Sequence, residues 1–126
     1  MSKPTIALVD DNEDNRILIQ ALLGARYEIV EYASGQEALE GIPTRPPELV
    51  LLDVSLPEMD GLEILRRLRK RPDLGSIPVV AFTAHAMVGD RERLLAAGFD
   101  EYVSKPIVSE KDLIALVEGL LQRETR

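Results

Sequence analysis

The chain contains no cysteine and only one histidine. It therefore cannot form a disulfide, a thiolate metal site or a thiol nucleophile, and a metal site rich in histidine is excluded as well. The sequence also lacks the motif G-x-x-x-x-G-K-[ST], which excludes a P-loop nucleotide-binding site. The chemistry of this protein must depend on other residue types.

Long apolar runs and an excess of positive charge are absent too. No run approaches the ~20 residues of a membrane span, and the residues from Met1 to Pro4 contain no hydrophobic region of a signal peptide. We therefore expect a cytoplasmic protein without a membrane partner. The 15 Lys and Arg residues are outnumbered by 22 Asp and Glu residues, which leaves a net charge of −7. This balance argues against nucleic acid as a partner.

The remaining composition is that of a soluble globular domain. The chain has 126 residues, of which 45% are apolar and 29% charged, and this length suffices for a hydrophobic core without disulfides or metals. No repeat, low-complexity tract or linker divides it. We expect a single domain over residues 1–126, with a core at about 5–122 and no output domain.

Short apolar runs bounded by turn residues predict five strands. The clearest run, 49–53, consists of four apolar residues and an acid, and turn residues follow it at once. This pattern is typical of a strand that is buried on both faces. The expected strands lie at residues 5–9, 28–33, 49–53, 77–82 and 101–104.

Cap residues, stop residues and apolar periodicity predict a helix after each strand. In the first helix, Ile17, Leu18, Ala21 and Leu22 recur at helical spacing. The prolines between 43 and 47 predict a non-helical link after the second helix. The expected helices run from about Ile17 to a stop at Gly24, from Ser34 to Gly41, from Asp60 to about Leu68, from about Met87 to Ala97 and from Ser109 to Gln122.

Strands that alternate with helices predict right-handed βαβ units and a parallel sheet. Helices then cover both faces, so the expected fold class is α/β with a doubly wound sheet. The carboxyl ends of all strands lie at one edge of such a sheet, where ligands usually bind. The polar residues expected at that edge are Asp10 and Asp11 after the first strand, Asp53 at the end of the third, Thr83 after the fourth and Lys105 after the fifth.

These residue types suit phosphoryl transfer. Carboxylate oxygens at an open site are ligands that Mg²⁺ prefers. A lysine and a hydroxyl supply a positive charge and a hydrogen-bond donor for anionic oxygens. Together with a carboxylate acceptor, they can position and neutralise a transferring phosphoryl group.

In order and spacing, these residues resemble the receiver domain of two-component response regulators. The matching motifs span essentially the whole chain. They are Asp10-Asp11, Asp53-x-x-x-Pro57-x-x-Asp60-Gly61, Thr83-Ala84, Tyr102 and Lys105-Pro106. The stretch 83–106 is most similar to stand-alone receivers of the cell-cycle type and to receivers attached to hybrid kinases. The resemblance implies a flavodoxin-like (βα)5 fold in three layers, with the strand order 2-1-3-4-5.

The resemblance also implies a role for each acid of the set. Asp53 would accept a phosphoryl group from a phosphohistidine of a histidine kinase or histidine phosphotransfer protein, in a magnesium-dependent reaction. Asp11 would bind Mg²⁺ directly, Asp10 would lie close behind it, and Asp53 and the backbone carbonyl of Ser55 would complete the protein ligands. The domain would assist its own phosphorylation and dephosphorylation, and it would not be an enzyme that acts on other substrates.

The other matching residues would contact the phosphoryl group or respond to it. The resemblance implies that Lys105 pairs with this group, and that the Thr83 hydroxyl and the Ala84 backbone amide bind its other oxygens. Tyr102 would change rotamer together with Thr83. His85 flanks the expected path of water to the phosphoryl group, although an exposed loop histidine is the simpler interpretation.

The biological role remains open between two alternatives. The first is a single-domain response regulator, a monomer or weak dimer, which signals through phosphorylation-dependent contacts of the face formed by 87–97, 101–104 and 109–122. The start at Met1 and the arginine-containing tail after Leu121 favour it. The second is the receiver portion of a hybrid histidine kinase. A more distant alternative is a flavodoxin-like protein that binds a small ligand, but acids stand where its phosphate pocket needs Ser, Thr or Gly.

Overall fold

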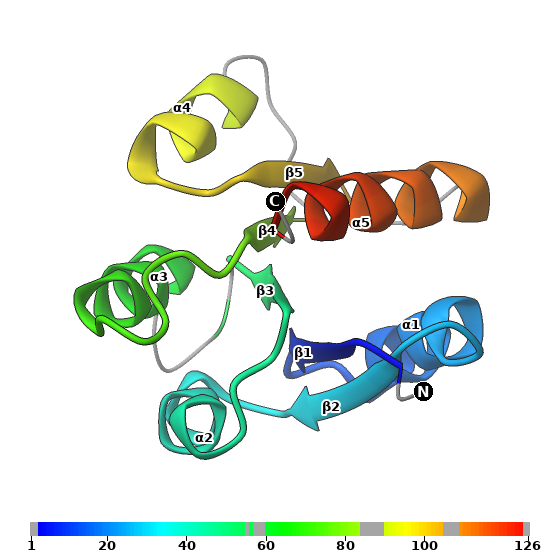
Figure 1. The fold of residues 1–126 in the computed structure, drawn as a ribbon, viewed down its shortest axis with the longest axis horizontal. Coiled ribbons are helices and arrows are strands. Elements are labelled where there is room, and N and C mark those ends of the chain that lie inside the picture. Colours follow the sequence, from blue (N-terminus) through cyan, green and yellow to red (C-terminus); the bar gives the residue numbers. More distant parts are fainter. Residues whose placement is uncertain (1–2, 55, 57–59, 84–89, 105–108, 125–126) are drawn as a thin grey trace.

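The computed structural model describes residues 3–54, 56, 60–83, 90–104 and 109–124. These residues form a five-stranded sheet flanked by helices (Figure 1). The strands are β1 (Thr5–Val9), β2 (Glu28–Tyr32), β3 (Leu49–Asp53), β4 (Val79–Thr83) and β5 (Glu101–Ser104). The helices are α1 (Glu13–Leu23), α2 (Gly35–Gly41), the 3₁₀ helix η1 (Ile42–Thr44), α3 (Gly61–Lys70), α4 (Asp90–Ala97) and α5 (Glu110–Glu124).

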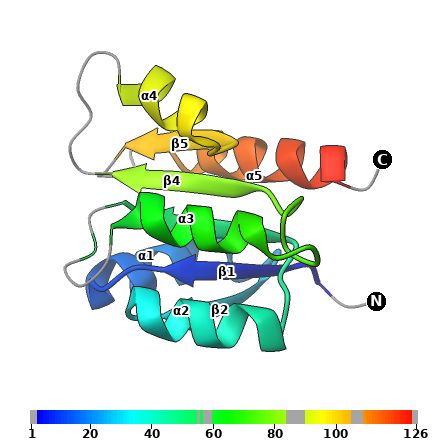
Figure 2. The same ribbon diagram turned by 90° about the vertical axis from the view of Figure 1, so that its left-hand side faces the viewer.

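Neighbouring strands pair in parallel, in the order β2-β1-β3-β4-β5. The helices α1 and α5 cover one face of the sheet, and α2, α3 and α4 cover the other (Figure 1). The expected three-layer, flavodoxin-like α/β fold is therefore confirmed. Figure 2 shows that β1 begins and α5 ends on the side of the molecule away from the strand tips. Among the described residues, no helix combines the length and the apolar character needed to cross a bilayer.

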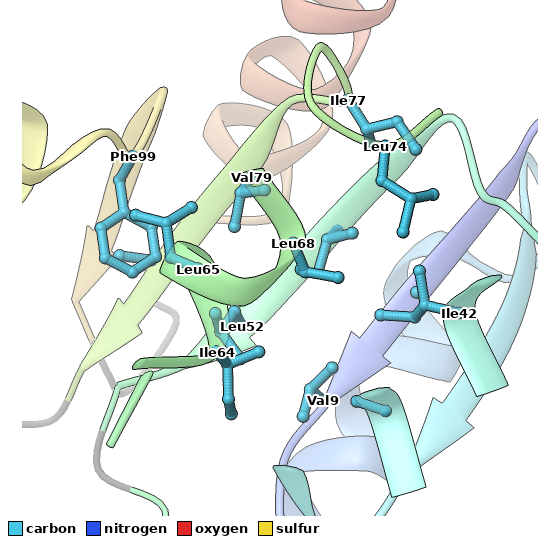
Figure 3. Packing of buried hydrophobic residues seen from close by; sticks show 14 of the residues in the cluster. Val9, Ile42, Leu52, Ile64, Leu65, Leu68, Leu74, Ile77, Val79 and Phe99 are labelled. Atoms are coloured by element: carbon cyan, nitrogen blue, oxygen red, sulfur yellow. The ribbon is translucent and has the colours of Figure 1, made fainter. Parts of the chain in front are cut away.

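The central strands are held from both faces by apolar packing. Every residue of β3 and β4 is buried, as their sequence pattern predicts. On one face, Leu52 and Val79 pack against Ile64, Leu65 and Leu68 of α3 (Figure 3). Burying one such side chain contributes about 1.5–3 kcal/mol, so α3 fixes the two strands firmly.

The opposite face is closed by α1 and α5. Ile19 and Leu23 of α1 and Val117 of α5 belong to one buried cluster with Leu8 and Leu51 of the sheet. β1 and β3 both contribute to this cluster, so packing against α1 and α5 holds this face of the two strands in place. They are the strands that carry the predicted acidic residues.

The buried face of α1 differs from the prediction. The predicted stripe begins with Ile17 and Leu18, yet these residues are 60% and 38% exposed. The structure instead buries Ile19 and Leu23 and half-buries Leu22. Both sets recur at a spacing of three to four residues, so periodicity alone cannot choose between them. The direction in which the chain enters α1 after β1 decides which set faces the core.

Other element boundaries differ too. The helix α1 begins at Glu13 and not at about Ile17, because the Asn12 side chain caps it. A proline explains each of two further differences. The link after α2 is not wholly non-helical, because Pro43 lies in the first turn of η1, where a missing N–H costs no helical bond. The strand β4 begins at Val79 and not at Ile77, since Pro78 has no N–H to donate to the ladder. The Pro78 carbonyl still accepts a hydrogen bond from the Val50 N–H at 2.9 Å.

The helix starts and stops agree with the cap residues. Asp60 Oδ1 accepts a hydrogen bond from the Leu62 N–H at 2.8 Å at the start of α3. Ser34 Oγ accepts one from the Glu37 N–H at 3.1 Å at the start of α2. Gly98 follows α4 with a positive φ of 119°, the conformation that ends many helices. Residues 87–89 of the expected fourth helix lie outside the described residues.

Two glycines provide a matched test of how closely α3 packs on β3. At Gly61, the first residue of α3, a Cβ atom would lie 2.7 Å from Val54 Cα and 3.1 Å from the Asp53 carbonyl oxygen. An alanine there must push α3 away from the end of β3. We therefore expect Gly61→Ala to lower the free energy of unfolding by about 1–3 kcal/mol.

The control is Gly119 in α5, where an added Cβ would meet nothing within 4 Å. Gly119→Ala should raise the free energy of unfolding by about 0.5–1 kcal/mol, because alanine has the higher helix propensity. Urea denaturation of both variants measures the two changes. If both substitutions changed the free energy of unfolding equally and in the same direction, the close approach of α3 to β3 would be contradicted.

Candidate functional site

The strand order reverses between β1 and β3. β1 has β2 on one side and β3 on the other, and the chain leaves β1 toward α1 but leaves β3 toward α3, on the opposite face (Figure 1). Open α/β sheets form a ligand crevice at such a reversal, beyond the carboxyl ends of the strands. Asp10 follows β1 directly and Asp53 ends β3, so the sheet places both acids at this point.

Three carboxylates meet at this reversal. Oxygen atoms of Asp10, Asp11 and Asp53 all lie within 4.8 Å of one another. Asp10 and Asp53 are only 3% and 5% exposed, whereas Asp11 is exposed. Two acids are thus shielded from water and the third faces it. We call these three residues the acidic pocket.

Hydrogen bonds hold Asp10 at the end of β1. Its N–H donates to the Tyr32 carbonyl oxygen at 3.1 Å, which extends the pairing of β1 with β2 beyond Val9. Its Oδ1 accepts from the Asn12 N–H at 2.9 Å. Asn12 Oδ1 in turn accepts from the Asn15 N–H at 3.2 Å and caps α1. The turn from the strand into the helix is therefore built on the Asp10 side chain.

The end of β3 is fixed in a similar way. The Val54 N–H donates to the Phe82 carbonyl oxygen of β4 at 2.9 Å, and the Gly61 N–H donates to the Val54 carbonyl oxygen at 3.1 Å. Asp53 is therefore set between the neighbouring strand and the start of α3. Its register partner is Phe82, so Thr83 lies one residue further along β4 at the same edge.

The predicted switch residues lie on one face of the sheet. Thr83 ends β4, is 5% exposed and lies opposite Ser104. Tyr102 lies opposite Ala81, two residues earlier on both strands. Since opposed residues share a face, the side chains of Thr83 and Tyr102 are diagonal neighbours. Tyr102 is half-buried against the cluster beneath α3.

Four residues to which the sequence analysis gives a role lie outside the described residues. They are Ser55, Ala84, His85 and Lys105, and the motif residues Pro57 and Pro106 lie outside them as well. The roles that the resemblance implies for them stay predictions.

Arg16 contacts the acidic pocket, although the sequence analysis did not identify it. Its Nη1 donates to the Asp10 carbonyl oxygen at 2.8 Å, and its Nε pairs with Glu31 Oε1 of β2 at 3.0 Å. In the sequence, Arg16 stands in a polar stretch at the start of a helix, where charged side chains usually face water. Only the placement of α1 beside β2 creates the contact, so no local pattern could have indicated it.

The donor set of the acidic pocket fits a hard divalent cation. Closely spaced carboxylates repel one another, and the repulsion is stronger where little water screens it, as at Asp10 and Asp53. A divalent cation would remove this repulsion, and carboxylate oxygens are the ligands preferred by Mg²⁺ and Ca²⁺. The acidic pocket can therefore bind a metal.

Comparisons with known proteins agree with this geometry. The family described as response regulator receiver domain matches residues 6–118. The polar-differentiation response regulator DivK of Brucella ovis is 43% identical over 104 residues, which cover 82% of this chain and 85% of DivK. The signal transduction histidine-protein kinase BarA of Escherichia coli is 42% identical over 108 residues, which cover 85% of this chain but only 12% of the kinase.

The fold also agrees with a solved structure. The receiver domain of the sensor histidine kinase PA1611 of Pseudomonas aeruginosa superimposes with a TM-score of 0.86 at 30% identity, over 96% of this chain and 99% of that one. That receiver has a magnesium ion coordinated in its active site cleft. The family match spans most of the chain, and the strand order and acidic pocket are those that the resemblance implies. The chain therefore belongs to the response regulator receiver domain family of two-component signalling.

Proposed function

We propose that Asp53 is the phosphoacceptor of this receiver and takes its phosphoryl group from a phosphohistidine of a histidine kinase or histidine phosphotransfer protein. The observation that carries this proposal is the convergence of Asp10, Asp11 and Asp53 within 4.8 Å. Of these acids, Asp53 ends the central strand and has Thr83 beside it on β4. Its strand thus lies between β1, which leads to the other two acids, and β4, which ends in Thr83.

The transfer forms one bond and breaks another. An oxygen of the Asp53 carboxylate attacks the phosphorus atom, a P–O bond forms and the P–N bond to the donor imidazole breaks. The electron pair leaves on the imidazole nitrogen, which takes up a proton from water, and Asp53 carries an acyl phosphate. The rest of the site contributes position and charge balance, which supply most of the catalysis in phosphoryl transfer.

Asp10, Asp11, Asp53 and the backbone carbonyl of Ser55 would hold a Mg²⁺ ion. When bound, Mg²⁺ supplies the positive charge that offsets the acceptor carboxylate and the phosphoryl oxygens. The burial of Asp10 and Asp53 supports this assignment, because two shielded carboxylates attract a cation more strongly than exposed ones. The magnesium of the PA1611 receiver supports it too.

Thr83, Ala84 and Lys105 would bind the phosphoryl oxygens after transfer. The Thr83 hydroxyl and the Ala84 N–H donate hydrogen bonds, and Lys105 contributes a positive charge. The Thr83 side chain must move toward the new oxygens, and this movement changes the packing on the face that it shares with Tyr102. The conformational effect of phosphorylation at the end of β3 would be transmitted to β5 in this way.

The domain would act as a response regulator of the single-domain kind. The similarity to DivK over 85% of its length supports this role. The alternative role, a receiver within a hybrid kinase, has its support in BarA, which is about as similar in sequence. In either role the domain would signal in the cytoplasm by protein contacts, as a phosphoacceptor and not as an enzyme for other substrates. A small-ligand carrier has no comparable support.

The face of α4, β5 and α5 is the proposed surface for a downstream protein. The strand β5 and the helix α5 enclose a hollow of about 210 Å³, whose lining includes Tyr102, Ser104 and Leu116. The Tyr102 side chain lies on the α4 side of the edge strand β5, so a change of its rotamer would alter the part of this face next to α4. We expect a monomer or weak dimer that presents this face to its target.

Asp53→Asn should abolish phosphorylation, because an amide cannot form an acyl phosphate. Incubation of the parent with acetyl phosphate and magnesium should add one base-labile phosphoryl group, measured by mass spectrometry of the intact protein. Asp73→Asn changes an exposed acid away from the pocket and should be labelled like the parent. Equal labelling of the Asp53→Asn variant would show that the acceptor is another residue.

Magnesium should raise the thermal midpoint of the parent by mass action, with a stabilisation of about 2.7 kcal/mol at ~100 times the dissociation constant. Asp11→Asn should abolish most of the rise, whereas Asp14→Asn, which removes the same charge from α1 outside the pocket, should keep it. Removing a charge from the pocket can itself stabilise the metal-free fold. The quantity to compare is therefore the difference between midpoints with and without magnesium, and no difference in the parent would refute the site.

Thr83→Ala and Tyr102→Ala should each reduce the gain in partner affinity that phosphorylation causes. Couplings of this kind are typically ~1–3 kcal/mol, or about 5–150-fold in affinity. Affinity for the target can be measured with and without the phosphoryl mimic beryllofluoride, with Tyr102→Phe as the control that keeps the ring. If both alanine variants retained the full gain, partners would sense the phosphoryl group without this pair.

A further inference from the structure

Arg16 joins two elements at the acidic pocket and is held there firmly. From α1, its Nη1 donates to the Asp10 carbonyl oxygen at 2.8 Å, and its Nε donates to Glu31 Oε1 of β2 at 3.0 Å. Gln20, one turn further along α1, approaches the other oxygen of Glu31 at 3.4 Å. The Arg16 side chain is only 15% exposed, whereas the Arg45 side chain, which pairs with another glutamate of β2, is 53% exposed.

The bond to Asp10 falls on the peptide unit that joins two predicted metal ligands. The Asp10 carbonyl and the Asp11 N–H belong to one planar, rigid unit. A hydrogen bond to its oxygen therefore restrains the directions in which the Asp10 and Asp11 side chains leave the backbone. On the other side of the Asp10 Cα, the N–H is bonded to Tyr32 of β2. The backbone is thus fixed on both sides of Asp10.

Helix stability does not explain the position of Arg16. The positive end of the helix dipole favours acids in the first turn, and Glu13 and Asp14 occupy that turn of α1. A cation at the fourth helical residue gains nothing from this dipole. A partly exposed ion pair, such as that with Glu31, typically contributes about 0–1 kcal/mol. The contact with Asp10 is therefore not a by-product of stabilising α1.

We propose that Arg16 is a positioning residue of the acidic pocket: it holds the peptide unit between Asp10 and Asp11 so that their carboxylates converge with that of Asp53. This inference rests on the proposed function, because it takes the pocket to be a magnesium site. Arg16 would act on the metal through the Asp10 carbonyl, to which its Nη1 donates. Glu31 holds the guanidinium group in place and offsets its charge.

The direction in which the magnesium dissociation constant changes when Arg16 is replaced distinguishes a positioning role from a purely electrostatic one. A positive charge near a cation site weakens cation binding by repulsion. If charge alone mattered, removing Arg16 would tighten magnesium binding. If Arg16 orients the peptide unit, removing it weakens magnesium binding in spite of the relieved repulsion. A residue that only stabilises the fold would change the thermal midpoint and leave the dissociation constant of the folded protein unchanged.

The test is an NMR titration of the full chain with magnesium, which reads the dissociation constant from amide shifts of the folded molecules. Arg16→Ala should raise this constant about 10-fold, the lower end of the effect of outer-shell partners. Arg16→Lys keeps the charge and the donors of a single nitrogen but lacks the planar fork that reaches Asp10 and Glu31 together, so it should give an intermediate increase. If the alanine variant does not fold, the lysine variant alone can test the proposal.

Arg45→Ala is the matched control. It removes the same charge and an ion pair to β2, but its partner is Glu28 at the opposite end of that strand, so the dissociation constant should equal that of the parent. An unchanged or lower constant in the Arg16 variants would overturn the positioning role while the magnesium site stands. A parent that shows no magnesium binding would refute the metal site itself, which distinguishes the two failures.

Discussion

The reversal of strand order between β1 and β3 is the constraint on which the rest of the structure depends. The two strands lie side by side, but their connections leave toward opposite faces of the sheet. Side chains at the two strand ends therefore meet without helices between them, and the sheet brings acids placed there to one edge. The strand order sets which strand ends are neighbours, and the loops and α1 then orient the individual carboxylates.

Repulsion within the acidic pocket destabilises the fold, whereas burial of the apolar core stabilises it. Asp10 and Asp53 are buried, and their carboxylates lie close to each other and to that of Asp11, so the three negative charges repel one another. Apolar clusters on both faces of the sheet offset this cost, since they hold β1 and β3 in register regardless of the charge between their tips. The stability of the domain therefore comes mainly from these apolar clusters and not from the acidic pocket.

The strands could be predicted from the sequence more accurately than the faces of the helices. The uninterrupted apolar run at 49–52, which ends at Asp53, is compatible with few structures other than a buried strand, and β3 has the predicted bounds. Helical spacing cannot tell whether Ile17 or Ile19 faces the core, because packing against the sheet makes that choice. The convergence of the acids could be predicted, because the ends of parallel strands align at one edge of the sheet. The contact of Arg16 with Asp10 could not be predicted, because it depends on how α1 lies beside β2.

The described chain begins and ends on the side away from the acidic pocket (Figure 2). A segment joined before β1 or after α5 can leave the domain without passing over the strand tips. The region matched here makes up most of DivK but only a small part of BarA. Because both ends of the described chain point away from the acidic pocket, further segments can be joined to a domain of this kind without covering the pocket.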